Sequence, residues 1–561
     1  MNKSYRSVWN RALGAWVAVS EVDRARSGRG ASVVVLAAAL LATGGAAVAQ
    51  PVYADGDNNT NPLTLAPGNT SLNVATGVAT QSGVIDGIGG GFTKTGDGLL
   101  ILGNRLSLTD PEIVNTYTGG TTLERGALEV TSGGSLGTGT LTITGGTLRG
   151  GVTLNNAVVV NGDFTVDPLD TMANSPNPAL NSQPPSREYG LTLAGPVTLN
   201  TDATIGFGGP SSVAYLLRIG GVMSGNHSVI FEAPTNPNYW GDVDFVGSQS
   251  NTYSGLTTLR GNLVMGLLRT GGATSIAGDL TVENSATAAI GVSEQIADTS
   301  IVTVNSTSGP TVNGVLLPGL AFINPNLTET VGTLNGVGTI GLGSSTLRTG
   351  AGDFSGTIFD GGVAGGDGKM VKYGPGVFTL SGVNTYAGGT TVEGGTLRVA
   401  NNSAVGTGAV TLAGGTTLAY DSARMTELAN AITLTGDAAL EVASLGVRQS
   451  GAIGESGGRR SLTKTGAGTL ELTAANTYSG GTVVQGGVLD MNGASALGSG
   501  AVQVDAGAGL RMSNAATLAS QAVTNQGSVD VSNVTAATAI GSLNGNGDVR
   551  LGARPLTGGA L

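Results

Sequence analysis

The sequence predicts an all-β protein built as a parallel β-helix, and three observations support this fold class. The chain has 561 residues, of which 96 are glycine, while only 11% are charged and 4% are aromatic. So much glycine disfavours long helices, because each glycine inside a helix costs about 1 kcal/mol relative to alanine. Short runs of Thr, Val and Leu between glycines are typical of short strands joined by tight turns. One sequence unit also recurs, as expected for stacked coils.

The recurring unit begins with a lysine and continues into an Asn-Thr-Tyr-x-Gly-Gly-Thr segment. Its copies lie near residues 92–130, 369–399 and 461–491, and a partial copy covers 251–265. The lysine precedes the asparagine by 12 residues in the second and third full copies but by 21 in the first. We therefore expect nine extra residues of the first copy, around 105–111, to leave the stack as a loop.

Apolar residues alternate within each copy, which places their side chains on one face of a strand. The expected inward positions are Leu128, Val130, Leu397, Val399, Leu489 and Met491. One coil cannot bury this face alone, but its neighbours in a stack can cover it. With roughly 20–25 residues per coil and about 4.8 Å between strands, the chain would form about twenty coils, on the order of 100 Å long.

The glycines and asparagines of the repeats are expected at the corners of the coils. Glycine adopts positive φ without strain, and asparagine forms turns or stacked amide ladders. The predicted turn residues are Gly96, Gly98, Asn115, Gly119, Gly120, Gly374, Gly376, Asn384, Gly388, Gly389, Gly466, Gly468, Asn476, Gly480 and Gly481.

The first 49 residues have the features of a cleaved secretory signal. A basic stretch containing Arg24, Arg26 and Arg29 precedes an apolar run over residues 31–41, followed by Ala47-Val48-Ala49. These features predict cleavage between Ala49 and Gln50. The apolar run is shorter than the roughly 20 residues that a membrane-spanning helix needs.

Two parts of the sequence resemble one family. Residues 1–21 follow the pattern M-N-K-x-Y-R-x-V-W-N…G-x-W-V-A-V-S-E, which resembles the extended signal peptide region of type V secreted proteins. The repeats resemble the passenger-associated transport repeats of autotransporters. This resemblance implies that the chain folds as a right-handed parallel β-helix. It also implies that the chain is a passenger that is secreted or exposed on the cell surface. The expected roles are adhesion or autoaggregation, together with help in its own passage through the outer membrane.

The same resemblance implies the partners. They are the secretion machinery of the inner membrane and an outer-membrane barrel, and the surface of a host or neighbouring cell is a further candidate. No series of amphipathic strands suited to a barrel occurs in residues 50–561, so we expect one to be encoded beyond Leu561. Without it, the product would remain in the periplasm.

Composition excludes several kinds of chemistry. Removal of residues 1–49 leaves 20 basic and 35 acidic residues, a formal net charge of −15, which disfavours nucleic acid as a partner. No cysteine and a single histidine, His227, leave no zinc site, and His227 is expected in a surface turn without a catalytic role. Asp86, Asp353 and the segment 365–368 could offer oxygen ligands for calcium, but no tandem calcium-binding repeat surrounds them. No cofactor is therefore expected.

The acidic residues are scattered singly along the sequence, so no catalytic pair is apparent and no enzymatic activity is expected. Two alternatives remain open: a secreted β-helix hydrolase or lyase, and a stalk for another functional domain. Two proline-containing segments, 167–188 and 234–240, are expected to loop out of the stack, either as binding loops or as decoration.

Overall fold

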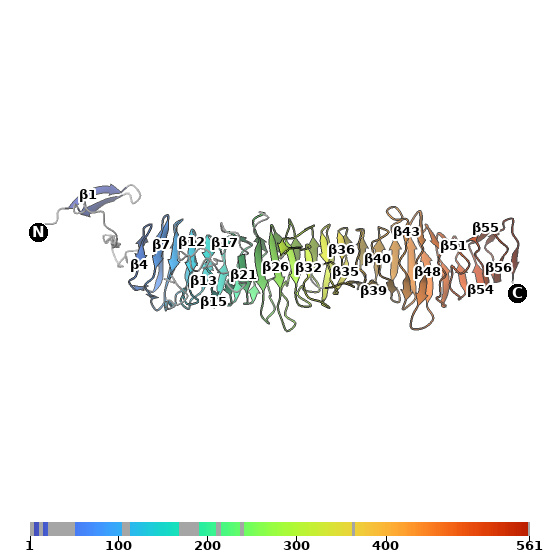
Figure 1. The fold of residues 1–561 in the computed structure, drawn as a ribbon, viewed down its shortest axis with the longest axis horizontal. Coiled ribbons are helices and arrows are strands. Elements are labelled where there is room, and N and C mark those ends of the chain that lie inside the picture. The colour runs from blue at the N-terminus through green and yellow to red at the C-terminus, as the bar shows by residue number, and fades with distance from the viewer. Residues whose placement is uncertain are drawn as a thin grey trace.

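The computed structural model describes residues 5–10, 15–20, 51–103, 113–167, 190–208, 215–235, 240–312, 314–361 and 365–558. Every regular element in these ranges is a β-strand, and the strands wind into a parallel β-solenoid of about 21 turns. Figure 1 shows the result as a long rod with β4 near one end and β56 near the other. Among the described residues, no helix is long and apolar enough to cross a membrane.

One sheet, which we call the spine sheet, runs along the whole rod. Its strands are β4 (Asn58–Asn59), β7 (Val78–Gln81), β10 (Leu99–Leu102), β12 (Ala127–Val130), β14 (Thr147–Arg149), β17 (Phe164–Asp167), β20 (Ala203–Phe207), β23 (Val229–Glu232), β25 (Thr257–Arg260), β27 (Leu280–Val282), β29 (Ile301–Val304), β33 (Thr328–Asn335), β35 (Thr346–Phe354), β37 (Lys369–Lys372), β38 (Val377–Leu380), β39 (Thr390–Val392), β40 (Thr396–Val399), β41 (Val410–Leu412), β42 (Thr417–Tyr420), β44 (Ile432–Leu434), β45 (Ala438–Val442), β47 (Ile453–Glu455), β48 (Ser461–Thr465), β50 (Gly481–Val484), β52 (Val502–Val504), β54 (Leu518–Asn525), β56 (Thr538–Gly545) and β58 (Leu556–Gly558).

Three shorter sheets complete the coils. The N sheet contains β3 (Val52–Tyr53), β6 (Gly68–Val74), β9 (Gly90–Thr95), β11 (Thr121–Leu123), β13 (Leu141–Ile143), β16 (Val158–Val160), β19 (Val197–Leu199) and β22 (Met223–Ser224). The middle sheet contains β15 (Thr153–Leu154), β18 (Leu191–Leu193), β21 (Tyr215–Ile219), β24 (Gly241–Phe245), β26 (Leu263–Leu267), β28 (Thr287–Ile290), β32 (Leu320–Phe322), β34 (Thr339–Gly341) and β36 (Thr357–Phe359). The C sheet contains β43 (Glu427–Leu428), β46 (Gly446–Gln449), β49 (Thr469–Leu472), β51 (Val488–Asn492), β53 (Gly509–Asn514), β55 (Ser528–Val534) and β57 (Asp548–Arg550).

Strand pairing in all four of these sheets is parallel, as the prediction of stacked coils requires. A small parallel pair joins β5 (Leu63–Thr64) to β8 (Ile85–Asp86). Two antiparallel hairpins stand outside the coils: β1 (Tyr5–Asn10) with β2 (Ala15–Ser20), and β30 (Thr311–Val312) with β31 (Val315–Leu316).

The core is a continuous column of mainly aliphatic side chains inside the rod, with tyrosine and phenylalanine rings among them. Leu397 and Leu418 are in register on β40 and β42, and both are fully buried. The six predicted inward residues, Leu128, Val130, Leu397, Val399, Leu489 and Met491, are each 0–1% exposed, which confirms the prediction. Burying a side chain of this size contributes about 1.5–3 kcal/mol, and each coil obtains this only from its neighbours.

The predicted excursions are described only in part. Residues 105–111 lie outside the described residues, as does most of the segment 167–188. In the segment 234–240, Trp240 is half-buried and packs against a small second apolar cluster of Val264, Ala289 and Leu317. The predicted cleavage residues Ala47, Ala49 and Gln50 also lie outside the described residues, so the boundary at residue 49 stays a prediction.

Candidate functional site

The lysine that begins each repeat is buried and binds backbone carbonyls of two coils. Lys94, Lys372 and Lys464 end up at inward positions of β9, β37 and β48, and each is at most 1% exposed. Each ammonium group donates three hydrogen bonds of 2.7–3.1 Å, two to its own turn and one to the next coil, which is the full capacity of an ammonium. The acceptors are the carbonyls of Thr95, Gly96 and Arg125, of Tyr373, Gly374 and Gly394, and of Thr465, Gly466 and Gly486.

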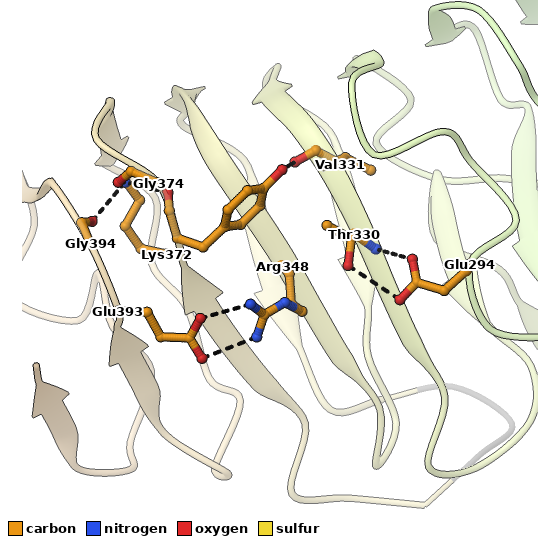
Figure 2. Close-up of polar contacts among 9 residues, drawn as sticks. Glu294, Thr330, Val331, Arg348, Lys372, Gly374, Glu393 and Gly394 are labelled. Carbon is orange, nitrogen blue, oxygen red and sulfur yellow. Dashed lines mark hydrogen bonds and ion pairs between the residues drawn. The ribbon is translucent and has the colours of Figure 1, made fainter.

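We call this arrangement the lysine clamp, and Figure 2 shows it for Lys372 with Gly374 and Gly394. The aliphatic stem of the lysine lies in the core while its charged end closes the turn. Burial lowers the pKa of Lys94 and of Lys464 to about 8, and it lowers the pKa of Lys372. The clamp therefore holds neighbouring coils together with a charge that has no acidic partner within hydrogen-bonding distance in the described structure.

The asparagine of each repeat forms a second clamp between coils. The side-chain oxygen of Asn384 accepts a hydrogen bond from the backbone amide of Ile358 at 2.7 Å, and its amide nitrogen donates to the carbonyl of Ala404 at 2.5 Å. Ile358 belongs to the preceding coil and Ala404 to the following one, so one side chain joins three coils. The equivalent bonds of the other copies are those of Asn115 to Ile85 and Ser135, of Asn251 to Met223 and Ser275, and of Asn476 to Ile453 and Ala496.

This geometry corrects the expectation of stacked amide ladders. Each of the four asparagines bonds to backbone groups. Other coils lie between one asparagine and the next, so their side-chain amides do not stack on one another. The physical reason is that a corner interrupts the strand-to-strand hydrogen bonds, and a buried backbone N–H or C=O left without a partner is costly. The asparagine side chain supplies both missing partners.

The tyrosine two residues after each asparagine is also fully buried. Its hydroxyl is hydrogen-bonded to the threonine hydroxyl four residues later, and burial raises the pKa of all four tyrosines. The pairs are Tyr117 with Thr121, Tyr253 with Thr257, Tyr386 with Thr390, and Tyr478 with Thr482. A buried tyrosine needs such a partner for its hydroxyl, and the threonine at this spacing provides it.

In the partial copy no lysine precedes Asn251 by 12 or 21 residues, and a buried arginine follows the copy instead. Arg269 is 0% exposed and donates to the carbonyls of Gln249 and Gly221 and to the side-chain oxygen of Asn251, at 2.6–2.7 Å. This arginine follows its asparagine by 18 residues, whereas the lysine of a full repeat precedes its asparagine.

The glycine corners divide into two classes. Gly96, Gly120, Gly374, Gly389, Gly466 and Gly481 have φ between +69° and +106°, a region that side chains disfavour. The other six predicted corner glycines, Gly98, Gly119, Gly376, Gly388, Gly468 and Gly480, do not have positive φ. At these positions a Cβ would come within 2.2–2.9 Å of atoms in the adjacent coil, so glycine is needed for close approach rather than for its dihedral freedom.

On the outside of the rod, polar contacts join coils across the spine sheet. Arg348 on β35 forms a two-pronged ion pair with Glu393, at 3.1 and 2.7 Å, which spans the intervening strand β37 (Figure 2). The guanidinium lies 5.6 Å from the ring centre of Tyr373, whose hydroxyl donates to the carbonyl of Val331 at 3.1 Å. Beside them Glu294 accepts hydrogen bonds from Thr330, and burial together with Asp298 raises the pKa of Glu294.

A longer row of charges crosses the C sheet, and we call it the charge ladder. One residue from each strand contributes, in the order Glu427, Arg448, Glu471, Asp490, Arg511, Asp530 and Arg550, and each is in register with the next. Five of these residues, with neighbouring small side chains, line a shallow groove of about 420 Å³. The expectation of singly scattered acids is therefore wrong for this face, because residues about 20 positions apart in sequence become neighbours when coils stack.

Three arginines neutralise most of this ladder. Arg448 pairs with Glu471 at 3.0 Å, Arg511 with Asp490 at 3.4 Å, and Arg550 with Asp530 at 3.9 Å. Within the described ranges, no three His, Cys, Asp or Glu side chains are grouped so that they could hold a metal ion. His227 is about one-third exposed and lies 3.4 Å from the carboxylate of Asp202.

Sequence reasoning missed the lysine clamp, although its signal was present. Phe92 and Leu462 are inward residues two positions before Lys94 and Lys464, so the period of two already placed both lysines in the core. Arg269 and Glu329 were also missed, although the same period of two marks them: Leu267 and Val331 are inward residues two positions away. Glu329 is fully buried and accepts hydrogen bonds from the backbone amides of Gln295 and Ile296.

Comparisons with known proteins agree with this architecture. Residues 1–50 match the family model described as the extended signal peptide of the type V secretion system. Residues 92–130, 370–399 and 462–491 match the passenger-associated-transport-repeat model. The chain is 41% identical over 70 residues to the adhesin BmaC autotransporter of Brucella suis biovar 1 (strain 1330). That segment covers 12% of this chain and 2% of the relative, and no solved structure matches the chain.

The matches place the three lysine clamps inside the three matched repeats. They also imply export by a type V pathway, to the cell surface or into the medium, with dependence on an outer-membrane translocator. The leader, the repeats and the stacked parallel coils together identify the chain as an autotransporter passenger.

Proposed function

We propose that the β-helix of residues 51–558 is the surface-displayed part of an adhesin and acts through its outer faces without catalysing a reaction. The observation that carries this proposal is the burial of the polar side chains that the repeats share. Lys464, Asn476 and Tyr478 all bond within the stack, so none of them faces a substrate. What remains for contact with another surface is the long exterior of the rod, and the similarity to an adhesin over 70 residues supports the same reading.

The clamps also support a role in outer-membrane passage. Each lysine clamp is complete only after the carbonyl of the next coil is in place, 22 residues further on for Lys464 and Gly486. A completed clamp makes the coil harder to reopen, because reopening leaves buried polar groups without partners. We propose that completed clamps oppose backward movement of the chain through the outer membrane. We also propose that residues 1–49 act as a removable leader. The partial copy at 251–265 would then be a fourth, divergent repeat.

A β-helix hydrolase or lyase is the competing proposal. Glu471 and Asp490 on neighbouring strands of the C sheet are the observation that favours it. Each carboxylate, however, is ion-paired with its own arginine, which favours two anions over the acid and base that glycoside cleavage uses. A non-enzymatic role fits this arrangement better.

Adherence of cells tests the proposal directly. Cells carrying the gene are compared with cells carrying an in-frame deletion of residues 51–558, on cultured epithelial cells and on matrix-coated plates. Surface exposure is verified in both strains with an antibody to a tag placed outside the deleted segment. We expect the deletion to lower adherence severalfold, and equal adherence of the two strains would refute the adhesin role. Release of reducing sugar from polysaccharides by the intact chain, abolished by E471Q, would support the hydrolase instead.

A further inference from the structure

The charge ladder of the C sheet has an order of signs that makes it complementary to itself. From Glu427 to Arg550 the signs run minus, plus, minus, minus, plus, minus, plus. Regular alternation is broken once, where Glu471 and Asp490 are neighbours. Because of this break, reversing the order gives the opposite sign at every position of the ladder. The one exception is the central residue, Asp490, which meets its own sign.

We propose that this face binds the same face of a second copy of the chain, antiparallel and centred on Asp490. A two-fold axis at Asp490 places Glu471 opposite Arg511, Arg448 opposite Asp530, and Glu427 opposite Arg550. The two-fold symmetry repeats each contact, so six attractive pairs form and one like-charged pair, Asp490 with its own copy, lies on the axis. This inference rests on the proposed adhesive role and names a partner for it.

No neighbouring register is complementary. A shift by one strand in one direction places Glu427 opposite Asp530 and Arg448 opposite Arg511. The shift in the other direction places Arg448 opposite Arg550 and Glu471 opposite Asp530. Like charges that meet across an interface are unfavourable, so the order of signs selects one register.

The surroundings of the ladder leave room for this contact. The neighbouring row on the same face is made of small residues over most of its length, namely Gly446, Thr469, Val488, Gly509 and Ser528. The arginines of the ladder are open to solvent, with exposed side-chain fractions of 48% for Arg448, 36% for Arg511 and 76% for Arg550. Both copies have the same spacing of about 4.8 Å between strands, so their charges coincide over about 29 Å.

Another charge row on the rod lacks this property. Glu129, Arg149 and Asp167 follow one another in register on β12, β14 and β17. Their order, minus, plus, minus, reads the same in both directions, so an antiparallel copy centred on Arg149 would meet only like charges. Self-complementarity is thus a property of the C sheet ladder and not of every charged row in this acidic protein.

A face of this size belongs to the class of weak, transient contacts. Many copies on one surface would strengthen the association without any new contact. The test therefore uses the full chain, exported with its leader and purified after processing, coupled to two colours of fluorescent beads. In 20 mM salt we expect mixed clusters of beads that disperse in 500 mM salt, because ion pairs on the surface are screened.

The variants R511E and E471R test the register. In either variant alone, the facing positions 471 and 511 carry like charges twice, and we expect clustering to fall roughly tenfold or more. A mixture of R511E beads with E471R beads restores opposite charges at both contacts, so clusters should contain both colours. The matched control is a mixture of R511E with E427R, which leaves like charges across the interface and should remain dispersed. Rescue by mixing also shows that both variants are folded.

Each other outcome overturns the inference. The inference is wrong if wild-type beads stay dispersed in 20 mM salt, if R511E beads cluster as wild type does, or if the two mixtures cluster equally. Clustering only after addition of heparin or polylysine would assign the face to an external polyelectrolyte instead. If beads stay dispersed while cells carrying the gene still adhere to epithelial cells, self-association fails and the adhesin proposal stands. If beads cluster but the cells do not adhere, the adhesin proposal fails and self-association stands.

Discussion

The lysine clamp makes a prediction about local stability that the substitution Lys464→Met tests. Methionine keeps the aliphatic part of the side chain in the core but removes the ammonium, so the carbonyls of Thr465, Gly466 and Gly486 lose their partner. Leaving a buried polar group unsatisfied costs about 1–3 kcal/mol. Because deleting the ammonium also removes the cost of burying a charge, we expect a net loss of about 2–3 kcal/mol in local stability.

Hydrogen exchange of backbone amides followed by mass spectrometry measures this loss by segment. Protection should fall by roughly 30- to 150-fold in residues 461–472 and 481–492, since 1.4 kcal/mol corresponds to a factor of ten. Coils near Lys94 should be unaffected, because stability in a stacked repeat is local. The matched control is Lys369→Met, which removes an exposed lysine from β37. If K464M exchanges no faster than K369M, the three hydrogen bonds contribute nothing and the clamp has been misinterpreted.

Three further predictions concern other parts of the chain. Asn384→Ala should destabilise the coils around Ile358 and Ala404 by about 2–4 kcal/mol, because a buried amide and a buried carbonyl lose their partners together; unchanged exchange in both segments would contradict it. Burial raises the pKa of Glu329 from 4.5 to about 8. The folded chain therefore holds that proton more tightly, and the stability it contributes is full below pH 4.5 and is lost as the pH rises through 8; protection of residues 290–335 should fall between pH 5 and 8, and a flat profile would argue against it. Exported protein should begin at Gln50 by N-terminal sequencing, and a product that still contains Trp9 would rule out cleavage there.

Most of the fold could be predicted from the sequence, because a coil repeats its pattern many times. The alternation of Leu397 with Val399 determines which side chains point inward, and the repeat spacing determines that the strands stack in parallel. The charge ladder could not be predicted in the same way. Its members are 19–23 residues apart, and the number depends on the length of each turn, so only the actual register brings Arg448 next to Glu471.

The repeats predicted the positions of the buried polar residues better than their bonding partners. Asn384 has an equivalent in every copy, and this recurrence predicted a corner residue. Its bonding partners could not be predicted, because only the three-dimensional structure shows which backbone groups at the corner lack a hydrogen bond. The repeat pattern places Lys372 at the start of its unit but does not predict its burial, because lysine is rarely buried without an acidic partner. Three carbonyls that converge on one point replace that partner.

The asparagine clamp also determines where the chain can be lengthened by engineering. In all three full repeats the asparagine and its carbonyl acceptor are 20 residues apart, as for Asn384 and Ala404. The partial copy has four more residues in this interval, since Asn251 and its acceptor Ser275 are 24 residues apart, and its clamp is still closed. The interval between Lys94 and Asn115 has also taken up nine extra residues while both clamps remain closed. A foreign peptide grafted between Gly103 and Ile113 should therefore be accepted, which makes this interval a natural position for displaying an epitope on the rod.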